Sequence, residues 1–244
     1  LRGFAVDDRF VSEVSAYPTP VTFCEIFPPD NFPLYFYREP KAPDLEIYTE
    51  ELDFDAISAA DIFWVTGTGL SAEPSRAATM AALAARGEHG ITILDLDYRR
   101  MFWPSVEEAH TAIREAVPLV DVAVGNLEEC EVAIGEREPE AAAAALLAAG
   151  VSLAVVKQGP AGVLGVRADG SVVVPPVPVE VVNGLGAGDA FGGALCHGLL
   201  SGWETERILQ FANAAGAVVA SRLACADAMP TTAELEELLE EARS

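Results

Sequence analysis

The fold is decided by residues 62–96, which read IFWVTGTGLSAEPSRAATMAALAARGEHGITILDL. This segment opens on a short apolar run, continues with an Ala-rich stretch of helical periodicity, and closes on a second apolar run. A helix between two short, continuously apolar strands is typical of a parallel β-α-β unit, because such strands are buried on both faces. The segment therefore predicts an α/β fold, with helices covering both faces of a mostly parallel sheet.

The same alternation continues toward the carboxyl end of the chain, and we expect residues 1–244 to form a single domain. Apolar runs predict strands at 62–66, 91–96, 120–124 and 153–157, and helices are expected at about 72–86, 106–116, 127–134 and 139–149. A hairpin is expected at 163–167 and 171–174, and closing helices at 188–200, 204–221 and 231–242.

Toward the amino end, two short runs rich in β-branched and aromatic residues occupy 21–26 and 34–38. Pro, Asp and Asn residues separate the two runs, which is typical of a hairpin with a loop of several residues. We therefore expect a small β lid at about 20–40.

Charge and composition exclude several classes of protein. The chain carries 15 Lys and Arg against 38 Asp and Glu, a formal net charge of −23. A surface this acidic repels phosphate backbones and anionic lipids, so we expect no nucleic-acid or membrane partner. No apolar stretch approaches the ~20 residues that a membrane helix needs. The four cysteines show no metal-ligand spacing, which indicates reduced thiols and a cytoplasmic protein.

In open α/β sheets, ligands bind at the carboxyl ends of the strands. The polar residues at these ends are therefore the candidates for a site. They are Thr66 to Gly69, Asp95 and Asp97, Asn126 and Glu129, Lys157 to Gly159, and the segment from Asn183 to Asp189.

Residues 183–191, which read NGLGAGDAF, carry the most specific chemical signal. Glycines let the backbone approach a ligand closely, and free N–H groups at a helix start bind anions. Asp189 lies in the first turn, where a carboxylate can take a hydroxyl proton during phosphoryl transfer. An ordinary glycine-rich turn, with Asp189 only balancing the helix dipole, is the alternative. The spacing fits neither a Rossmann fingerprint nor a Walker A loop.

The glycine motif and two further segments, in the same order, resemble the ribokinase (PfkB) family of sugar kinases. Residues 126–129 (NLEE) resemble the family's Asn-x-x-Glu motif, and residues 157–162 (KQGPAG) resemble its strand-end Gly-x-x-Gly segment. The resemblance covers essentially the whole chain. It implies a ribokinase-like three-layer sandwich with a small β lid, and ATP and Mg²⁺ as cofactors.

The resemblance also implies a role for each matching residue. Asp189 would be the catalytic base, and the amides of Gly186, Ala187 and Gly188 would form the anion hole. Asn126 and Glu129 would organise Mg²⁺ and the phosphates, through water. The nucleotide would be bound by Lys157, Gly159, Gly162, Asn183, Gly184 and Asn213, with the helix at 213–220 flanking the adenine.

Residues 32–44 and 95–103 resemble the branch of the family that acts on keto-deoxy sugar acids. In that branch, arginines from the lid and from a strand end hold the substrate carboxylate. This implies a substrate site of Arg38, Tyr37, Asp97 and Arg99. The alternatives are surface arginines paired with acids, another sugar or nucleoside as substrate, and a non-catalytic nucleotide-binding module.

The chain departs from the family's pattern in two places. The family's first β-α-β unit and its Gly-Gly-Asn substrate region should precede residue 1, so we expect the chain to lack an amino-terminal part. Many relatives have Asp-Thr before the Gly-Ala-Gly-Asp core, serving a monovalent cation, whereas Asn183 and Gly184 stand here. Potassium dependence is therefore left open. Family lid strands often pair between subunits, which makes a homodimer a further expectation.

Overall fold

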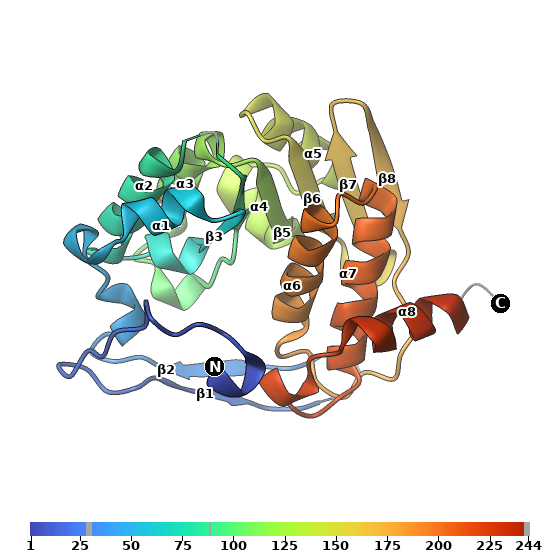
Figure 1. Ribbon diagram of the computed structural model, residues 1–244, viewed down its shortest axis with the longest axis horizontal. Helices are drawn as coiled ribbons and strands as arrows, with labels where there is room; N and C mark the ends of the chain where they lie inside the picture. Colours follow the sequence, from blue (N-terminus) through green and yellow to red (C-terminus); the bar gives the residue numbers. More distant parts are fainter. Residues whose placement is uncertain (28–30, 88, 242–244) are drawn as a thin grey trace.

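The computed structural model describes residues 1–27, 31–87 and 89–241, and its centre is a six-stranded sheet in the order β3-β4-β5-β6-β7-β8 (Figure 1). Strands β3 to β6 are parallel, and β7 and β8 are antiparallel to their neighbours. The predicted mostly parallel sheet is confirmed. Its strands are β3 (Ile62–Thr66), β4 (Ile91–Asp95), β5 (Val122–Asn126), β6 (Leu153–Lys157), β7 (Val163–Arg167) and β8 (Gly170–Val174).

Helices cover both faces of this sheet, as predicted. One face carries α2 (Ser75–Arg86), α3 (Val106–Ala116), α4 (Leu127–Ile134) and α5 (Pro139–Ala148), and the other carries α6 (Ala187–Leu200) and α7 (Thr205–Ala220). The short α1 (Phe54–Ala59) packs against α2, and α8 (Thr232–Glu241) packs against α7. Short 3₁₀ turns occupy Arg2–Phe4, Pro43–Leu45, Thr49–Glu51, Gly67–Leu70, Arg100–Phe102, Val117–Leu119, Gly159–Ala161 and Ala226–Ala228.

Successive strand residues serve two separate hydrophobic cores, one on each face. In β4, Leu94 packs with the α2–α5 layer and Ile93 packs with the α6–α7 layer, and both are fully buried. In β5, Ala123 faces the first layer and Val124 the second. This alternation follows from the two-residue period of a strand, and it explains why each strand is apolar along its whole length.

Two predicted boundaries shift for local reasons. Helix α2 begins at Ser75 instead of near residue 72, because Pro74 precedes it as the N-cap residue. Strand β5 begins at Val122 and continues to Asn126, whereas the apolar run predicted 120–124. At its start, the Asp121 carboxylate accepts the N–H of Thr92 at 2.7 Å, while the Asp121 N–H donates to the Thr92 carbonyl at 2.9 Å.

The predicted lid is a two-stranded antiparallel sheet of β1 (Val21–Cys24) and β2 (Leu34–Tyr37). It lies across the carboxyl ends of the parallel strands, below the main body in Figure 1. Side chains of β2 alternate between half-buried and exposed, which identifies an inner and an outer face. Residues 28–30 of the predicted connecting loop lie outside the described residues.

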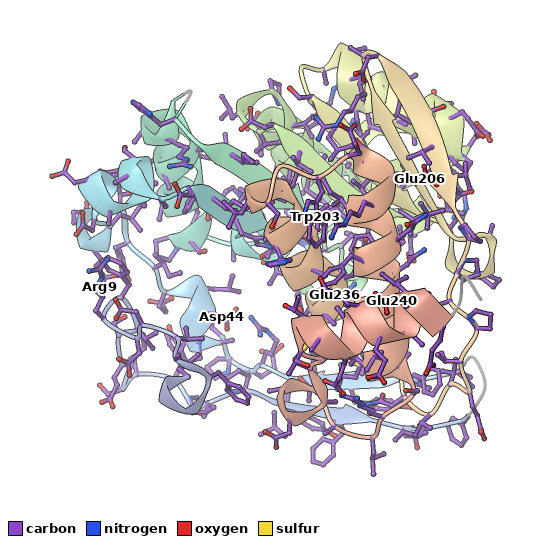
Figure 2. The ribbon with its side chains drawn as sticks, turned by 45° about the vertical axis from the view of Figure 1, so that its right-hand side comes forward. Arg9, Asp44, Trp203, Glu206, Glu236 and Glu240 are labelled. Carbon is purple, nitrogen blue, oxygen red and sulfur yellow. The ribbon has the colours of Figure 1, made fainter. Side chains whose placement is uncertain are left out.

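The outer helices present acidic side chains to solvent. In α8, Leu235 is buried, while Glu236 and Glu240 are exposed and project outward, and Glu206 in the first turn of α7 is exposed as well (Figure 2). The Glu-rich end of the chain is thus the wet face of a helix. Among the described residues, no helix has the length and apolar character that a membrane crossing requires.

Candidate active site

A cavity of about 720 Å³ lies between the lid, the carboxyl ends of the parallel strands and the start of α6. Every element that the sequence places at the ligand-binding edge contributes to it, as expected for an open α/β sheet. Its lining is Phe32, Leu34, Trp64, Thr66, Asp95, Asp97, Arg99, Glu129, Lys157, Gly184, Leu185, Gly186, Gly188, Asp189, Gly192, Gly193 and Cys196.

The glycine loop delivers the start of α6 to this cavity. Gly186 is the N-cap residue and has a φ of +86°, a conformation that side chains rarely adopt. Because glycine has no side chain, nothing caps the helix from its own N-cap position. Gly186 and Gly188 of the predicted anion hole line the cavity, whereas Ala187 does not, and its N–H makes a long turn bond of 3.4 Å to Gly184.

Asp189 lies in the first turn of α6 and is exposed toward the cavity. Within the described part of the chain, no side chain or backbone group makes a hydrogen bond or ion pair with its carboxylate. Asp189 is therefore a carboxylate that is held in position and remains free to accept a proton.

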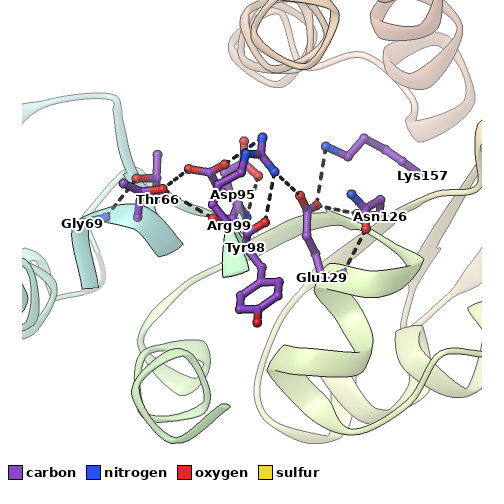
Figure 3. Close-up of polar contacts among 10 residues, drawn as sticks. Thr66, Gly69, Asp95, Tyr98, Arg99, Asn126, Glu129 and Lys157 are labelled. Carbon is purple, nitrogen blue, oxygen red and sulfur yellow. Dashed lines mark hydrogen bonds and ion pairs between the residues drawn. The ribbon is translucent and has the colours of Figure 1, made fainter. Parts of the chain in front are cut away.

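A chain of ion pairs crosses the strand ends on the other side of the cavity (Figure 3). Arg99 Nη2 lies 3.1 Å from Asp97 Oδ1, and Arg99 Nη1 lies 3.3 Å from Glu129 Oε1. Lys157 Nζ lies 3.9 Å from Glu129 Oε2. At the far end, the Thr68 hydroxyl donates to Asp97 Oδ2 at 2.6 Å. These contacts link the turn after β3 and the segment after β4 to α4 and β6.

Glu129 is fixed by a capping box at the start of α4. The Asn126 N–H donates to Glu129 Oε2 at 2.7 Å, and the Glu129 N–H donates to Asn126 Oδ1 at 3.0 Å. Glu129 is only 3% exposed, so its charge depends on these partners and on Arg99 and Lys157. The Asn-x-x-Glu motif therefore has a structural role that is evident from the geometry.

Asp95 lines the cavity at the end of β4, where the sequence predicts a candidate for the site, but the family resemblance gives it no role. Burial raises the pKa of its carboxyl to about 6; Lys157 opposes this rise, and the negative charges of Glu129 and Asp97 add to it. Among the described residues, its carboxylate accepts one long bond, of 3.3 Å, from the N–H of Asp97. Asp97 has a φ of +30°, which turns the chain sharply after β4.

The lid residues predicted to bind substrate do not line the cavity. Arg38 pairs with Asp44 at 2.5 Å and stacks over the ring of Phe102, 4.6 Å from its centroid. Tyr37 is 64% exposed and lies edge-on to Phe23 on the outer face of the lid. Of the predicted substrate residues, the structure brings Asp97 and Arg99 to the cavity and leaves Arg38 and Tyr37 outside it.

The predicted nucleotide residues fall into two groups. Lys157 and Gly184 line the cavity. Gly162 packs against the carbonyl of Val174, and Asn213 of α7 donates to the same carbonyl at 3.4 Å and to that of Pro175 at 3.0 Å. The structure thus brings Gly162 and Asn213 together beside the end of β8. Gly159 lies in the turn between β6 and β7, and Asn183 is buried behind the glycine loop.

Several apolar lining residues were not singled out from the sequence. Trp64 packs so closely on α6 that a side chain at Gly192 would meet its ring at 2.7 Å. Phe32 and Leu34 approach from the lid. Cys196 adds a thiol whose pKa is raised by burial to about 11, so it stays neutral. The position of Trp64 within a strand that ends at the site was the one available signal.

The donor set suits Mg²⁺ that arrives with a nucleotide. Within residues 1–27, 31–87 and 89–241, no group of three or more His, Cys, Asp or Glu side chains could hold a metal ion alone. Mg²⁺ typically keeps several waters and binds one or two carboxylates together with substrate phosphates. Glu129 and Asn126, whose side-chain oxygens are already engaged, could reach such an ion through water.

Comparisons with known proteins show the family and the fold of the chain. The model of the pfkB family carbohydrate kinase matches residues 1–232. The 5-dehydro-2-deoxygluconokinase of Geobacillus kaustophilus (strain HTA426) is 30% identical over 240 residues, which are 96% of this chain and 71% of that protein. An E. coli protein described as a ribokinase II, with ATP and Mg²⁺, is 25% identical with a TM-score of 0.78, covering 86% of this chain and 68% of its own. A fructokinase double mutant from Vibrio cholerae O395, with fructose, ADP and potassium ion bound, is 25% identical with a TM-score of 0.75, covering 84% and 68%.

Proposed function

The chain belongs to the pfkB family of carbohydrate kinases, and on this premise we propose that it transfers the γ-phosphoryl group of ATP to the primary hydroxyl of 5-dehydro-2-deoxy-D-gluconate. One observation supports this proposal above the others. The carboxylate of Asp189 has no partner among the described residues and lies beside the uncapped start of α6, inside the cavity. A free base next to an anion-binding helix start suits phosphoryl transfer to an alcohol.

The proposed step uses the two halves of the cavity differently. Asp189 accepts the proton of the substrate hydroxyl while the hydroxyl oxygen forms a bond to the γ-phosphorus of ATP. At the same time, the bond between the γ-phosphorus and the bridging oxygen breaks, and that oxygen leaves with ADP. The amides at Gly186 and Gly188 stabilise negative charge on the moving phosphoryl group. When bound with ATP, Mg²⁺ neutralises charge on the phosphate oxygens, and Asn126 and Glu129 would hold it through water.

Arg99 and Lys157 are the two cationic side chains in the cavity lining, which also holds four acidic ones: Asp95, Asp97, Glu129 and Asp189. We infer that Arg99 binds the substrate carboxylate, because its side chain is 38% exposed and lines the cavity. A planar guanidinium can hold a carboxylate through two parallel bonds while keeping a second ion pair. Arg38 would join this site when the lid closes over the substrate and excludes water.

The assembly and location of the protein extend this proposal. Val21, Phe23, Tyr35 and Tyr37 are each about half exposed or more and form an apolar outer face on the lid. We propose that two copies pair through this face; sedimentation of a single monomeric species at micromolar concentration would contradict it. All four cysteines are free, which suits the reducing cytoplasm, and cell fractionation tests that location.

A neutral sugar is the second candidate substrate. Both cations of the cavity are engaged with acids, Arg99 with Asp97 and Glu129, and Lys157 with Glu129. A site whose positive charges are already balanced needs no anionic substrate, which favours a sugar such as fructose. A sugar acid must instead compete with Asp97 or Glu129 for Arg99.

An ADP-release assay of residues 1–244 with MgATP separates these candidates. The panel is 5-dehydro-2-deoxy-D-gluconate, 2-keto-3-deoxygluconate and fructose. We expect kcat/KM for the first compound to exceed that for fructose by about 100-fold. Fructose has no carboxylate, so it cannot form the partly buried ion pair with Arg99. A preference for fructose would favour the neutral-sugar reading. Binding of ATP without turnover on any of the three would favour a non-catalytic nucleotide-binding module.

A further inference from the structure

Asn183 is the buried polar residue at the start of the glycine loop. It is 3% exposed, lies behind the cavity lining, and has a side-chain amide with partners at both ends. Its Oδ1 accepts the N–H of Leu185 at 3.0 Å and faces the thiol of Cys24 at 3.7 Å. Its Nδ2 donates to the carbonyl of Leu223 at 3.3 Å. A buried amide engaged in this way stabilises one arrangement of the chain around it.

These partners belong to three segments that are far apart in the sequence. Cys24 ends lid strand β1, Leu185 belongs to the glycine loop, and Leu223 follows the end of α7. The backbone repeats the connection, because the N–H groups of Val182 and Asn183 both donate to the carbonyl of Ala220, at 2.8 and 3.0 Å. The glycine loop that carries the anion-binding amides is therefore held against the lid and against the segment after α7.

The chemistry of this amide does not fit a monovalent cation. A potassium ion at this place would need oxygen ligands with free lone pairs, such as a carboxylate and backbone carbonyls. Oδ1 of Asn183 already faces two donors, and the Leu223 carbonyl accepts an N–H from Nδ2. Asn183 is also neutral, so it does not supply the negative charge that an aspartate would place here.

We propose that Asn183 is the positioning residue of the glycine loop, and that its side-chain amide takes the place of a monovalent cation. It joins the loop to the Leu223 carbonyl by a hydrogen bond, where a cation would instead need oxygen atoms with free lone pairs. The anion-binding amides are then held in place without potassium. The predicted effect of Asn183 on turnover rests on the proposed kinase activity. The predicted effect of Asn183 on the stability of the folded protein does not.

The structural test is thermal unfolding of residues 1–244 in potassium, sodium and choline chloride, each at about 0.1 M so that screening is equal. The Tm of the unchanged protein should agree among the three salts within about 1 °C. Asn183→Ala should lower Tm by about 4–8 °C in every salt, because it leaves buried partners without a hydrogen bond.

Asn183→Asp gives the decisive comparison. It places a carboxylate oxygen against the Leu223 carbonyl, so it should lower Tm by about 4–8 °C in choline chloride, and potassium should restore about half of that loss. Asn31→Asp is the matched control, because it makes the same change at an exposed residue and should show no salt preference. Selective stabilisation of the unchanged protein by potassium, by more than about 2 °C, would overturn the proposal, as would an Asn183→Asp variant without any potassium preference.

ADP release in the same salts tests the consequence for phosphoryl transfer. The unchanged protein should turn over equally in potassium and choline, within about twofold, while Asn183→Asp should lose about tenfold in kcat in choline and recover in potassium with KM for the sugar little changed. A strict potassium requirement of the unchanged protein would contradict the inference. If no salt gives ADP release, the proposed kinase activity fails, and the unfolding comparison still decides the role of Asn183.

Discussion

Asp189 and Glu129 occupy the same position in their helices, the third residue of the first turn, and both face one cavity. Their surroundings are opposite. Glu129 is 3% exposed and is held by the Asn126 N–H, Arg99 and Lys157, whereas Asp189 is exposed and has no partner among the described residues. The residue before each helix accounts for the difference, since α4 has Asn126 as its N-cap and α6 has Gly186.

An asparagine N-cap and a glutamate at the third position close on each other, and two backbone N–H groups are satisfied inside the protein. A glycine N-cap offers no side chain, and the shorter aspartate does not bond back to it. The start of α6 therefore keeps its amides and its carboxylate available to a ligand. The comparison shows that one helix position can hold a structural acid or a reactive one, depending on the capping residue.

The largest expected effect comes from removing the charge of the free acid. Asp189→Asn should lower kcat by about 10²–10⁴-fold, because an amide cannot accept the hydroxyl proton. The Kd for ATP should change by less than about threefold, since the anion-binding amides remain. ADP release and calorimetric titration of ATP measure the two effects. Asp169→Asn, in the exposed turn between β7 and β8, is the control, and an unchanged kcat in Asp189→Asn would remove Asp189 from the reaction.

A stability measurement sharpens the same comparison. Glu129→Ala should lower stability by about 2 kcal/mol, or about 4–8 °C in Tm, because it leaves the Asn126 N–H and two cations without a buried partner. Asp189→Ala should change Tm by less than about 2 °C, since nothing in the described structure depends on that carboxylate. Unfolding of both variants by heat provides the measurement. Equal losses would mean that the capping residues do not separate the two roles.

Sequence reasoning predicted the layered α/β fold well, because continuous apolar strands and Ala-rich helices leave few other arrangements. It also predicted that Asp189 and the glycine loop lie at a helix start on the ligand-binding edge of the sheet, because their geometry is local to one turn before a helix. The Asn-x-x-Glu spacing suits a capping box as well as the metal role that the resemblance implies; the structure shows the box, and the metal role stays a prediction. The capping box could have been predicted from the sequence, because its residue types and spacing are local.

The lid was harder to interpret, for a physical reason. A hairpin predicts alternation, but Leu34, Tyr35, Phe36 and Tyr37 are all apolar or aromatic, so the pattern does not say which face turns inward. The structure places Tyr37 outside and pairs Arg38 with Asp44. Such choices depend on tertiary contacts with Phe102 and with the segment after the lid, which the local sequence does not encode.

A third acid, Asp95, gives the smallest expected effect and extends the comparison to a strand end. It lacks both the caps of Glu129 and the exposure of Asp189, and burial raises its pKa from 3.8 to about 6. The folded protein therefore binds a proton that the unfolded chain has released, between these two pH values. The stabilising contribution of the protonated form is fully present below about pH 4, and it is lost as pH rises through about 6.

Asp95→Asn keeps an acceptor for the Asp97 N–H and removes the titration. Near pH 4.5 the variant and the unchanged protein should therefore be similar in stability, whereas near pH 7.5 the variant should be more stable by about 1 kcal/mol, because it no longer holds a buried charge. Chemical denaturation at both pH values measures the difference, and Asp169→Asn corrects for general effects of lost charge. The stability difference between Asp95→Asn and the unchanged protein could instead be equal at both pH values, or larger in acid. Either result would show that burial does not destabilise the Asp95 carboxylate, which would then resemble the exposed Asp189 more than a buried acid.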